Sequence, residues 1–449
     1  MDSSACSRCC HCCGAHGARR LPHPPLAPPP PCQKKNSYEA DGIIAATGRL
    51  LVQRDYLFPR HSHAFVLEHP TWPVEWLSIT PFLAWQDHMA TGQSDLALAF
   101  QDILHTNSKI GYLDATGLLD TSKMGSHIVD WMPNGDESDQ TVQRGEFTAS
   151  DYMSVTNMYA ARGLDLLAQM VAAGGQPGNA SVYAAESAAL TAAIRAKMWN
   201  GTNFCDGVCS DPKIGGNSRV MSNMFSLFFG LVPAENIPGV WQGVADWGLE
   251  QMGDFGAFFY QLAITSGYYA PYYDTPDDGT AIVTALTKCD TYSWCSGLLA
   301  DNLTMTRESW HDGTYSHGWG SSAIVGVSLG VIGLHQTAPA FAAFTLKSKL
   351  GPLTSATATV PTIRGFITVA AVPGAVNVTV PCNVAATLCA PRAAADAALF
   401  TPRTHALLLD GVEALAEAAG GHLCLAAPVG CGAAGAPRQL LVRARAVAV

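Results

Sequence analysis

The spacing of apolar residues changes once along this chain of 449 residues, and that change limits what it can fold into. From about residue 77 to 340, apolar residues recur at the three- and four-residue intervals of amphipathic helices. The helices expected on this basis are Ile79–Thr91, Asp95–Thr106, Thr148–Ala173, Ser181–Trp199, Val220–Leu231, Val240–Met252, Ala257–Gly267, Thr280–Lys288 and Ser321–Leu334. So many helices with little strand signal between them predict antiparallel helical hairpins wound into a toroid.

After about Thr345 the period becomes two and β-branched residues dominate, which predicts strands. The expected strands are Thr357–Val369, Val376–Val380, His405–Leu409, His422–Ala426 and Leu440–Val447. The Ala-rich stretches 390–398 and 412–419 fit either strands or short helices. The fold class predicted is therefore mainly α, with a C-terminal antiparallel β-sandwich over residues 345–449.

The first 40 residues are set apart by their composition, which is rich in Cys and Pro and of low complexity. We expect them to be disordered, with the helical domain covering residues 41–344. No basic start followed by an apolar run is present, so these residues do not read as a secretory signal. We expect them to be an incomplete or mispredicted beginning of a secreted protein. The run Cys9-Cys10-His11-Cys12-Cys13 lacks the two-residue spacers of a zinc site, and no metal is predicted.

The eight cysteines that follow residue 40 form four pairs that are close in sequence, which predicts small disulfide clips in an oxidising compartment. These pairs are Cys205/Cys209, Cys289/Cys295, Cys382/Cys389 and Cys424/Cys431. Four glycosylation sequons, at Asn179, Asn200, Asn302 and Asn377, agree with a secreted glycoprotein. Secretion or a place in the secretory lumen is the localisation expected.

Charge and motifs limit the partners. The net charge of −10 comes without a basic stripe, which argues against nucleic acid and favours a neutral ligand such as a sugar. The most apolar stretch, Ser321–Leu334, is too short to span a bilayer, so no membrane partner is expected. No phosphate-binding loop, nucleophile elbow or His-Glu-x-x-His motif occurs, and no cofactor is predicted. The sequence does not indicate an oligomeric state.

Two segments place carboxylates among indole rings: Pro70-Thr-Trp-Pro-Val-Glu-Trp76, and Thr306-Arg-Glu-Ser-Trp310 followed by Ser316-His-Gly-Trp-Gly320. Aromatic faces stack on sugar rings, and a pair of carboxylic groups can protonate a glycosidic oxygen and activate water. These segments therefore predict a glycoside hydrolase. Each tryptophan is also compatible with core packing, and His317 with a satisfied interior histidine.

These and other segments, in their order along the chain, resemble the α-L-rhamnosidase family of glycoside hydrolases from about Glu68 to Gly365. The further segments that match are Ile128-Val-Asp-Trp-Met-Pro, Ser222-Asn-Met-Phe-Ser-Leu-Phe-Phe-Gly-Leu, Phe255-Gly-Ala-Phe-Phe and Gly330-Val-Ile-Gly-Leu. The resemblance implies an (α/α)6 barrel, an inverting mechanism and terminal L-rhamnose as the sugar removed. Fewer than twelve helices are predicted, so the barrel is expected to be incomplete at its start.

The resemblance also implies catalytic roles. Glu308 takes the place of the general base in the family's Thr-Thr-Trp-Glu-x-Trp segment. The family pattern Glu-x-x-x-Trp-x-x-Asp fits Glu68, Trp72 and Glu75, which makes Glu68 the acid; in the other register Glu75 is the acid. The family's Cys-Pro-x-Arg-x-Glu-Arg motif is not kept around these residues. The substrate-binding residues implied are Trp72, Trp76, Asp130, Trp131, His317 and Trp319.

Overall fold

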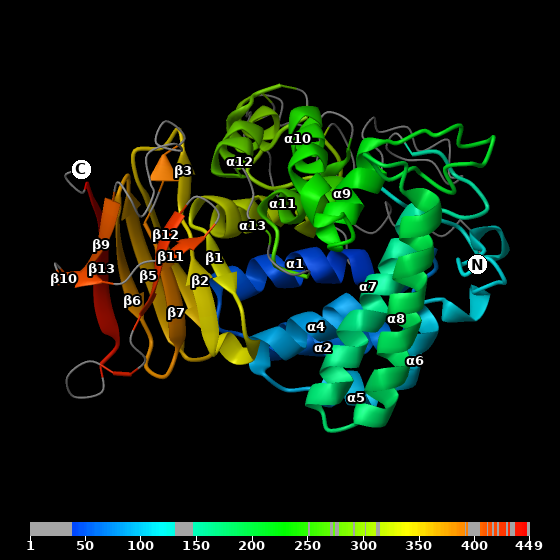
Figure 1. Ribbon diagram of the computed structural model, residues 1–449, viewed down its shortest axis with the longest axis horizontal. Helices are drawn as coiled ribbons and strands as arrows, with labels where there is room; N and C mark the ends of the chain where they lie inside the picture. The colour runs from blue at the N-terminus through cyan, green and yellow to red at the C-terminus, as the bar shows by residue number, and fades with distance from the viewer. Residues whose placement is uncertain are drawn as a thin grey trace, which may run out of the picture.

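The computed structural model describes residues 38–130, 147–249, 252–269, 273, 278–290, 292–300, 302–310, 315–390, 392–393, 405–410, 412–414, 417–419, 422–427, 430–431 and 436–446. Helices occupy one side of the molecule and stacked β-sheets the other (Figure 1). The buried apolar side chains form two clusters, one among the helices and one among the strands. In the part of the chain that is described, no helix combines the length and the apolar character needed to cross a lipid bilayer.

The helical side is built from a series of helices joined by short turns. Their bounds are α1 (Glu39–Val52), α2 (Leu57–Glu68), α3 (Val74–Ser78), α4 (Thr80–Thr91), α5 (Asp95–Ala99), α6 (Gln101–Asn107), α7 (Ser154–Ala173), α8 (Pro177–Met198), α9 (Val220–Phe228), α10 (Ile237–Trp247), α11 (Asp254–Thr265), α12 (Asp278–Thr287) and α13 (Ala323–Gly326). Two irregular segments flank α13, the 3₁₀ turn η6 (Gly318–Ser322) and the π turn η7 (Val327–Val331).

Inner and outer helices alternate along the chain. Every residue of α9 and α11 is buried, whereas α8 and α10 bury only one side. A helix that is apolar on all sides needs cover on all sides, which explains the inner position of α9 and α11. The inner helices contact one another in the order α1, α4, α7, α9, α11 and α13, and α13 in turn contacts α1.

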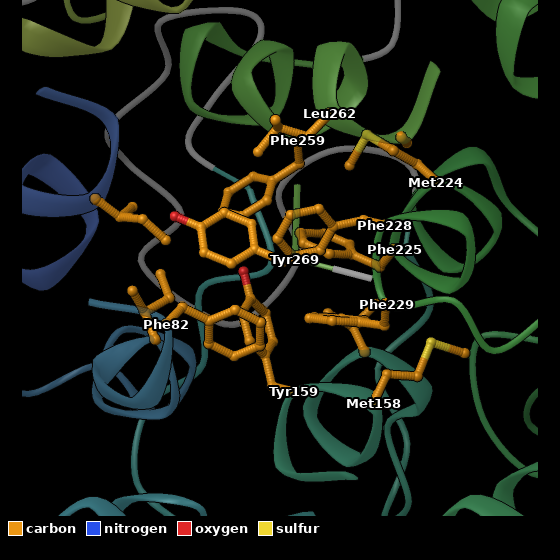
Figure 2. Packing of buried hydrophobic residues seen from close by; sticks show 14 of the residues in the cluster. Phe82, Met158, Tyr159, Met224, Phe225, Phe228, Phe229, Phe259, Leu262 and Tyr269 are labelled. Atoms are coloured by element: carbon orange, nitrogen blue, oxygen red, sulfur yellow. The ribbon is translucent and has the colours of Figure 1, made fainter. Parts of the chain in front are cut away.

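Aromatic side chains fill the space between these inner helices (Figure 2). Rings from four helices and one loop meet there, and centroids such as those of Phe225 and Phe259, 4.9 Å apart, have the separations favoured by aromatic pairs. The residues of this cluster include Phe82, Tyr159, Phe225, Phe228, Phe229, Phe259 and Tyr269. Such packing makes the middle of the helical region a solid core, so that binding sites lie at its ends and edges.

The C-terminal side consists of a five-stranded sheet in the order β1-β2-β7-β12-β11, a six-stranded sheet in the order β10-β9-β13-β6-β5-β4, and the pair β3-β8. The strands are β1 (Leu334–Gln336), β2 (Ala343–Leu346), β3 (Lys349–Gly351), β4 (Ala356–Thr362), β5 (Gly365–Val372), β6 (Ala375–Val380), β7 (Ala385–Cys389), β8 (Arg392–Ala393), β9 (His405–Leu409), β10 (Val412–Ala414), β11 (Glu417–Ala419), β12 (His422–Ala427) and β13 (Arg438–Ala446). The pairing is antiparallel except for β2 with β7 and β3 with β8, which are parallel.

Several sequence expectations are confirmed and others need correction. The mainly helical part followed by small sheets is as predicted, and 412–419 forms the strands β10 and β11. The expected helix 321–334 is present as the consecutive helical turns η6, α13 and η7, but it ends at Val331, and Leu334 already begins β1. The expected single strand 357–369 is the hairpin of β4 and β5. The hairpin of α1 and α2 was not predicted.

Two of the four predicted disulfides are confirmed and two are wrong. Cys205 pairs with Cys209, and Cys289 with Cys295. The other four cysteines form the long-range pairs Cys382–Cys431 and Cys389–Cys424. The reason is register, since β7 and β12 are neighbouring antiparallel strands in which Cys389 and Cys424 lie directly opposite each other. The cysteines before residue 33 and the motif at residues 9–13 lie outside the described residues.

Candidate active site

Glu75 lies in the first turn of α3 and is fully buried. Its carboxylate accepts hydrogen bonds from His127 Nδ1 at 2.7 Å, from the backbone N–H of Ile128 at 2.8 Å and from Thr156 Oγ1 at 2.5 Å. Burial alone would raise the pKa of Glu75, but the hydrogen bonds and the charge of His127 outweigh it, and the pKa is lowered. This arrangement favours an ionised carboxylate that joins α3, α7 and the 121–130 loop.

A cluster of aromatic rings lies next to this carboxylate. Trp76 and Trp319 meet edge to face with centroids 6.5 Å apart, and Phe255 packs against both, at 6.4 Å from Trp76 and 5.3 Å from Trp319. Trp76 and Trp319 are 3% and 0% exposed, so both rings are integral to the helical core. The structure thus brings together two of the predicted sugar-binding tryptophans from segments more than 200 residues apart in sequence and fixes them rigidly.

His317 connects this aromatic cluster to the predicted base. Its ring lies 4.3 Å from that of Trp319, centroid to centroid, and its Nδ1 accepts from the backbone N–H of Trp319. The opposite nitrogen, Nε2, therefore carries a proton, and it lies 3.4 Å from Asp41 Oδ1 and 4.0 Å from Glu308 Oε1. Three carboxylate and imidazole groups, from α1 and from the two chain segments around residues 308 and 317, thus converge beside the indole of Trp319.

Asp130 is completely buried at the N-terminus of α11. Its two carboxylate oxygens accept from the backbone N–H groups of Gly253 and Gly256, at 2.7 and 2.8 Å. A negative charge in this position satisfies free N–H groups and complements the helix dipole. Asp130 therefore anchors the 121–130 loop to α11. Its predicted neighbour Trp131 lies outside the described residues.

Glu68 and Trp72 lie on the exposed turn between α2 and α3. Glu68 is the last residue of α2 and is exposed, and Trp72 is 56% exposed. The buried Glu39 of α1 holds this turn, because its carboxylate accepts from the backbone N–H and the hydroxyl of Thr71. Burial raises the pKa of Glu39. The turn therefore presents one carboxyl group and one indole to the surrounding solvent.

The structure adds residues that sequence reasoning missed. Asp41, His127 and Thr156 contact predicted site residues, and Asp254 follows Gly253 at the start of α11. Burial, and next the charge of Asp130, raise the pKa of Asp254 well above its usual range. Only the position of Asp254, directly before the Phe255-Gly-Ala-Phe-Phe segment, could have marked it in the sequence. Within the described residues, no three His, Cys, Asp or Glu side chains are grouped so that they could hold a metal ion.

Comparison with known proteins identifies the kind of fold. Residues 58–246 match the model of the bacterial α-L-rhamnosidase six-hairpin glycosidase domain. The structure is similar to that of the α-L-rhamnosidase from Dictyoglumus thermophilum, with a TM-score of 0.69 and 13% identity over 90% of this chain and 46% of that one. It is also similar to Streptomyces avermitilis α-L-rhamnosidase complexed with L-rhamnose, with a TM-score of 0.64 and 15% identity over 90% of this chain and 38% of that one.

A third similar structure, the α-L-rhamnosidase from Aspergillus terreus, gives a TM-score of 0.60 and 17% identity over 78% of this chain and 43% of that one. This chain thus spans less than half the length of these three proteins. No curated protein sequence matches it. The resemblance predicted from the sequence is nevertheless confirmed: residues 58–246 match a bacterial α-L-rhamnosidase six-hairpin glycosidase domain, and most of the chain shares its fold with solved α-L-rhamnosidases.

Proposed function

We propose that this protein is a glycoside hydrolase that removes terminal α-L-rhamnose from glycosides or polysaccharides with inversion at the anomeric carbon. The observation that carries the proposal is the convergence of Glu308 and Asp41 on His317 beside Trp319 and Trp76, within a fold shared with α-L-rhamnosidases. The buried indoles of Trp76 and Trp319 support this site from the core, and the carboxylate of Glu308 can hold the attacking water.

In this proposal residues 41–344 form a closed (α/α)6 catalytic barrel and residues 345–449 a β-sandwich, to which β1 and β2 add strands from just before that boundary. The contact of α13 with α1, at the two ends of the helical series, supports closure of the barrel. The hairpin of α1 and α2 supplies the beginning of the ring that the helical periodicity leaves out.

The proposed mechanism assigns Glu308 as general base and Glu68 as general acid. Glu308 takes a proton from water as the water oxygen attacks the anomeric carbon, and Glu68 gives a proton to the departing glycosidic oxygen on the opposite face. The choice of Glu68 over Glu75 is supported by the hydrogen bonds of Glu75, which hold it as a buried carboxylate. Glu75 then acts by fixing α3 and the turn that carries Trp72. Trp76, Asp130, Trp131, His317 and Trp319 are proposed to shape the sugar site.

The four disulfides suit an oxidising compartment, and we propose an extracytoplasmic location. The sequon residues Asn179, Asn200, Asn302 and Asn377 are all exposed, which leaves each accessible to glycosylation.

The proposal is tested with purified protein and a panel of 4-nitrophenyl glycosides that includes the α-L-rhamnoside. Release of nitrophenol from the α-L-rhamnoside alone is expected, and proton NMR at early times should show β-L-rhamnose as the first product. Release of a different sugar would instead favour another inverting glycosidase on the same fold. Retention of the α configuration in the first product would contradict the mechanism.

A second candidate function is a non-catalytic carbohydrate-binding protein. It is favoured by the segment around Glu68 and Glu75, which does not keep the family's Cys-Pro-x-Arg-x-Glu-Arg motif. Binding of L-rhamnose without turnover of any glycoside in the panel would support it.

A further inference from the structure

A cavity of about 170 Å³ opens between the first turn of α11 and the chain segment 293–310. Trp294 and Trp310 form one wall, with their rings 5.1 Å apart and at 87° to each other. Both indoles are fixed by their N–H groups, which donate to the carbonyl oxygens of Gly320 and Met252. The wall is therefore rigid and apolar.

Further apolar side chains, Leu298, Leu303 and Met305, also line the cavity. Its polar lining residues are Asp254, Ser293, Thr304, Thr306, Arg307 and Ser309. Arg307 and Ser309 line it and are the chain neighbours of Glu308. The cavity thus adjoins the segment that carries the proposed base. An apolar wall facing a few polar groups is the lining expected for a ligand with one apolar face and a few hydroxyl groups.

Asp254 is the unusual group in this cavity. The residue is 4% exposed, and its Oδ1 is buried with no hydrogen-bond partner. The N–H groups at the start of α11 that a carboxylate in this position would usually accept from are already bound by Asp130. Asp254 therefore does not act as the cap of its own helix.

A buried polar oxygen without a partner costs free energy, and a protein retains such a group most readily where a ligand supplies the missing partner. Burial and the charge of Asp130 raise the pKa of Asp254 against the opposing charge of Arg307, which favours the neutral carboxyl, and a neutral carboxyl can both donate and accept a hydrogen bond. A sugar hydroxyl does the same. The indole wall suits the C–H face and methyl group of a deoxysugar.

We propose that this cavity binds the deoxyhexose ring of the substrate and that Asp254 determines its affinity by hydrogen bonding to a ring hydroxyl. The inference deepens the proposed function and rests on it for the identity of the sugar. A site built to bind a hydroxyl group discriminates strongly against analogues that lack it, because its own polar group is then left unpaired. Asp254 is accordingly a specificity-determining residue.

The test compares Asp254→Ala and Asp254→Asn with the wild-type protein. L-rhamnose is titrated while tryptophan fluorescence is followed, since two indoles line the cavity, and KM, kcat and the thermal midpoint are measured in parallel. For Asp254→Ala we expect Kd and KM to rise by about tenfold, the value of one hydrogen bond, with kcat little changed. Asp254→Asn keeps a donor and an acceptor and should stay within about threefold of wild type.

The thermal midpoint separates this role from a structural one. Loss of an unpaired buried carboxyl should leave the midpoint of Asp254→Ala unchanged or higher, whereas a structural residue would lower it. Asp102→Ala, on the exposed face of α6, is the matched control and should change neither affinity nor midpoint. Leu303→Trp, which fills the cavity without altering Asp254, should also weaken binding.

Wild-type affinity in Asp254→Ala or in Leu303→Trp would overturn the inference. So would a loss of kcat in Asp254→Asn at unchanged KM, because that result would make Asp254 a proton donor instead. The two proposals fail separately. If L-rhamnose binds and Asp254→Ala weakens it but no glycoside is hydrolysed, only the hydrolase proposal falls. If glycosides are hydrolysed and Asp254→Ala is unaffected, only the present inference falls.

Discussion

The imidazole of His127 bridges two acceptors, with Nδ1 2.7 Å from Glu75 Oε1 and Nε2 3.1 Å from the carbonyl oxygen of Thr121. A carboxylate and a carbonyl oxygen can only accept, so both ring nitrogens donate and His127 is an imidazolium. Burial acts to lower the pKa of His127, but the hydrogen bond and charge of Glu75 outweigh it and raise the pKa. Glu75 and His127 thus form a buried ion pair.

Replacing Glu75 should destabilise the protein strongly. Glu75→Ala leaves the His127 imidazolium buried without its partner, and breaking a buried pair in this way costs about 3–5 kcal/mol of the free energy of unfolding. Glu68→Ala, at the exposed end of α2, is the control and should change it by less than about 0.5 kcal/mol. Urea unfolding followed by circular dichroism measures both. Similar stabilities for the two variants would contradict the ion pair.

The same pair predicts a pH dependence of stability. The lowered pKa of Glu75 means that its contribution is complete above about pH 4.5 and is lost as the pH falls through the lowered value. The raised pKa of His127 means that its contribution is complete below about pH 6.5 and is lost as the pH rises through the raised value. The pair should therefore stabilise most between these two values.

Thermal midpoints of the wild type and of a Glu75→Gln, His127→Gln double variant, measured from pH 3 to 9, check this expectation. Other titrating groups are common to both proteins and cancel in the difference. The difference should be largest between about pH 4.5 and 6.5, and a difference independent of pH would rule out the charged pair.

Periodicity predicted one-sided helices such as α8 and fully buried ones such as α9 and α11, but it did not predict the hairpin of α1 and α2. The range of α4 was predicted to within one residue, because its apolar residues recur regularly and Gly92 ends it with a positive φ of 77°. The 321–334 segment reads as a helix and is helical as far as Val331, but its packing was not foreseen: a Cβ at Gly326 would lie 2.2 Å from Gln261 Oε1. Gly326 permits the close approach of α11, and no local pattern in the sequence reveals that neighbour.

The site was predictable to the extent that its residues lie in motifs. Trp76, His317, Trp319 and Glu308 were predicted because indoles and carboxylates cluster in short segments, and contacts join these residues in the structure. The partners that set their charge states come from elsewhere in the chain. His127 lies 52 residues from Glu75 in sequence, and only the fold brings the two together. The roles of Glu68, Glu75 and Glu308 in catalysis stay predictions.

The corrected disulfide pairing can be tested directly. Proteolysis without reduction, followed by mass spectrometry, should give linked peptides containing Cys382 with Cys431 and Cys389 with Cys424. These bridges close loops of 49 and 35 residues, and loss of either should cost about 2–4 kcal/mol of stability. A Cys389→Ser, Cys424→Ser double variant measures that cost for one bridge. Detection of a peptide in which Cys382 is linked to Cys389 would contradict these bridges and support the local pairing predicted from the sequence.

Substitution of the proposed acid and base should separate their roles. Glu308→Gln is nearly isosteric and should lower kcat by about 100- to 10,000-fold at an unchanged thermal midpoint, because the amide cannot take a proton from water. Glu235→Gln, an exposed change on a surface turn, is its control and should leave kcat unchanged.

In the pH profile of kcat/KM, loss of the acidic limb belongs to the base and loss of the alkaline limb to the acid. We expect Glu308→Gln to lose the acidic limb and Glu68→Gln the alkaline limb. Glu75→Gln should keep both limbs and lose stability instead. If Glu75→Gln removes the alkaline limb while Glu68→Gln keeps it, the acid is Glu75 and the ion pair with His127 must open during catalysis.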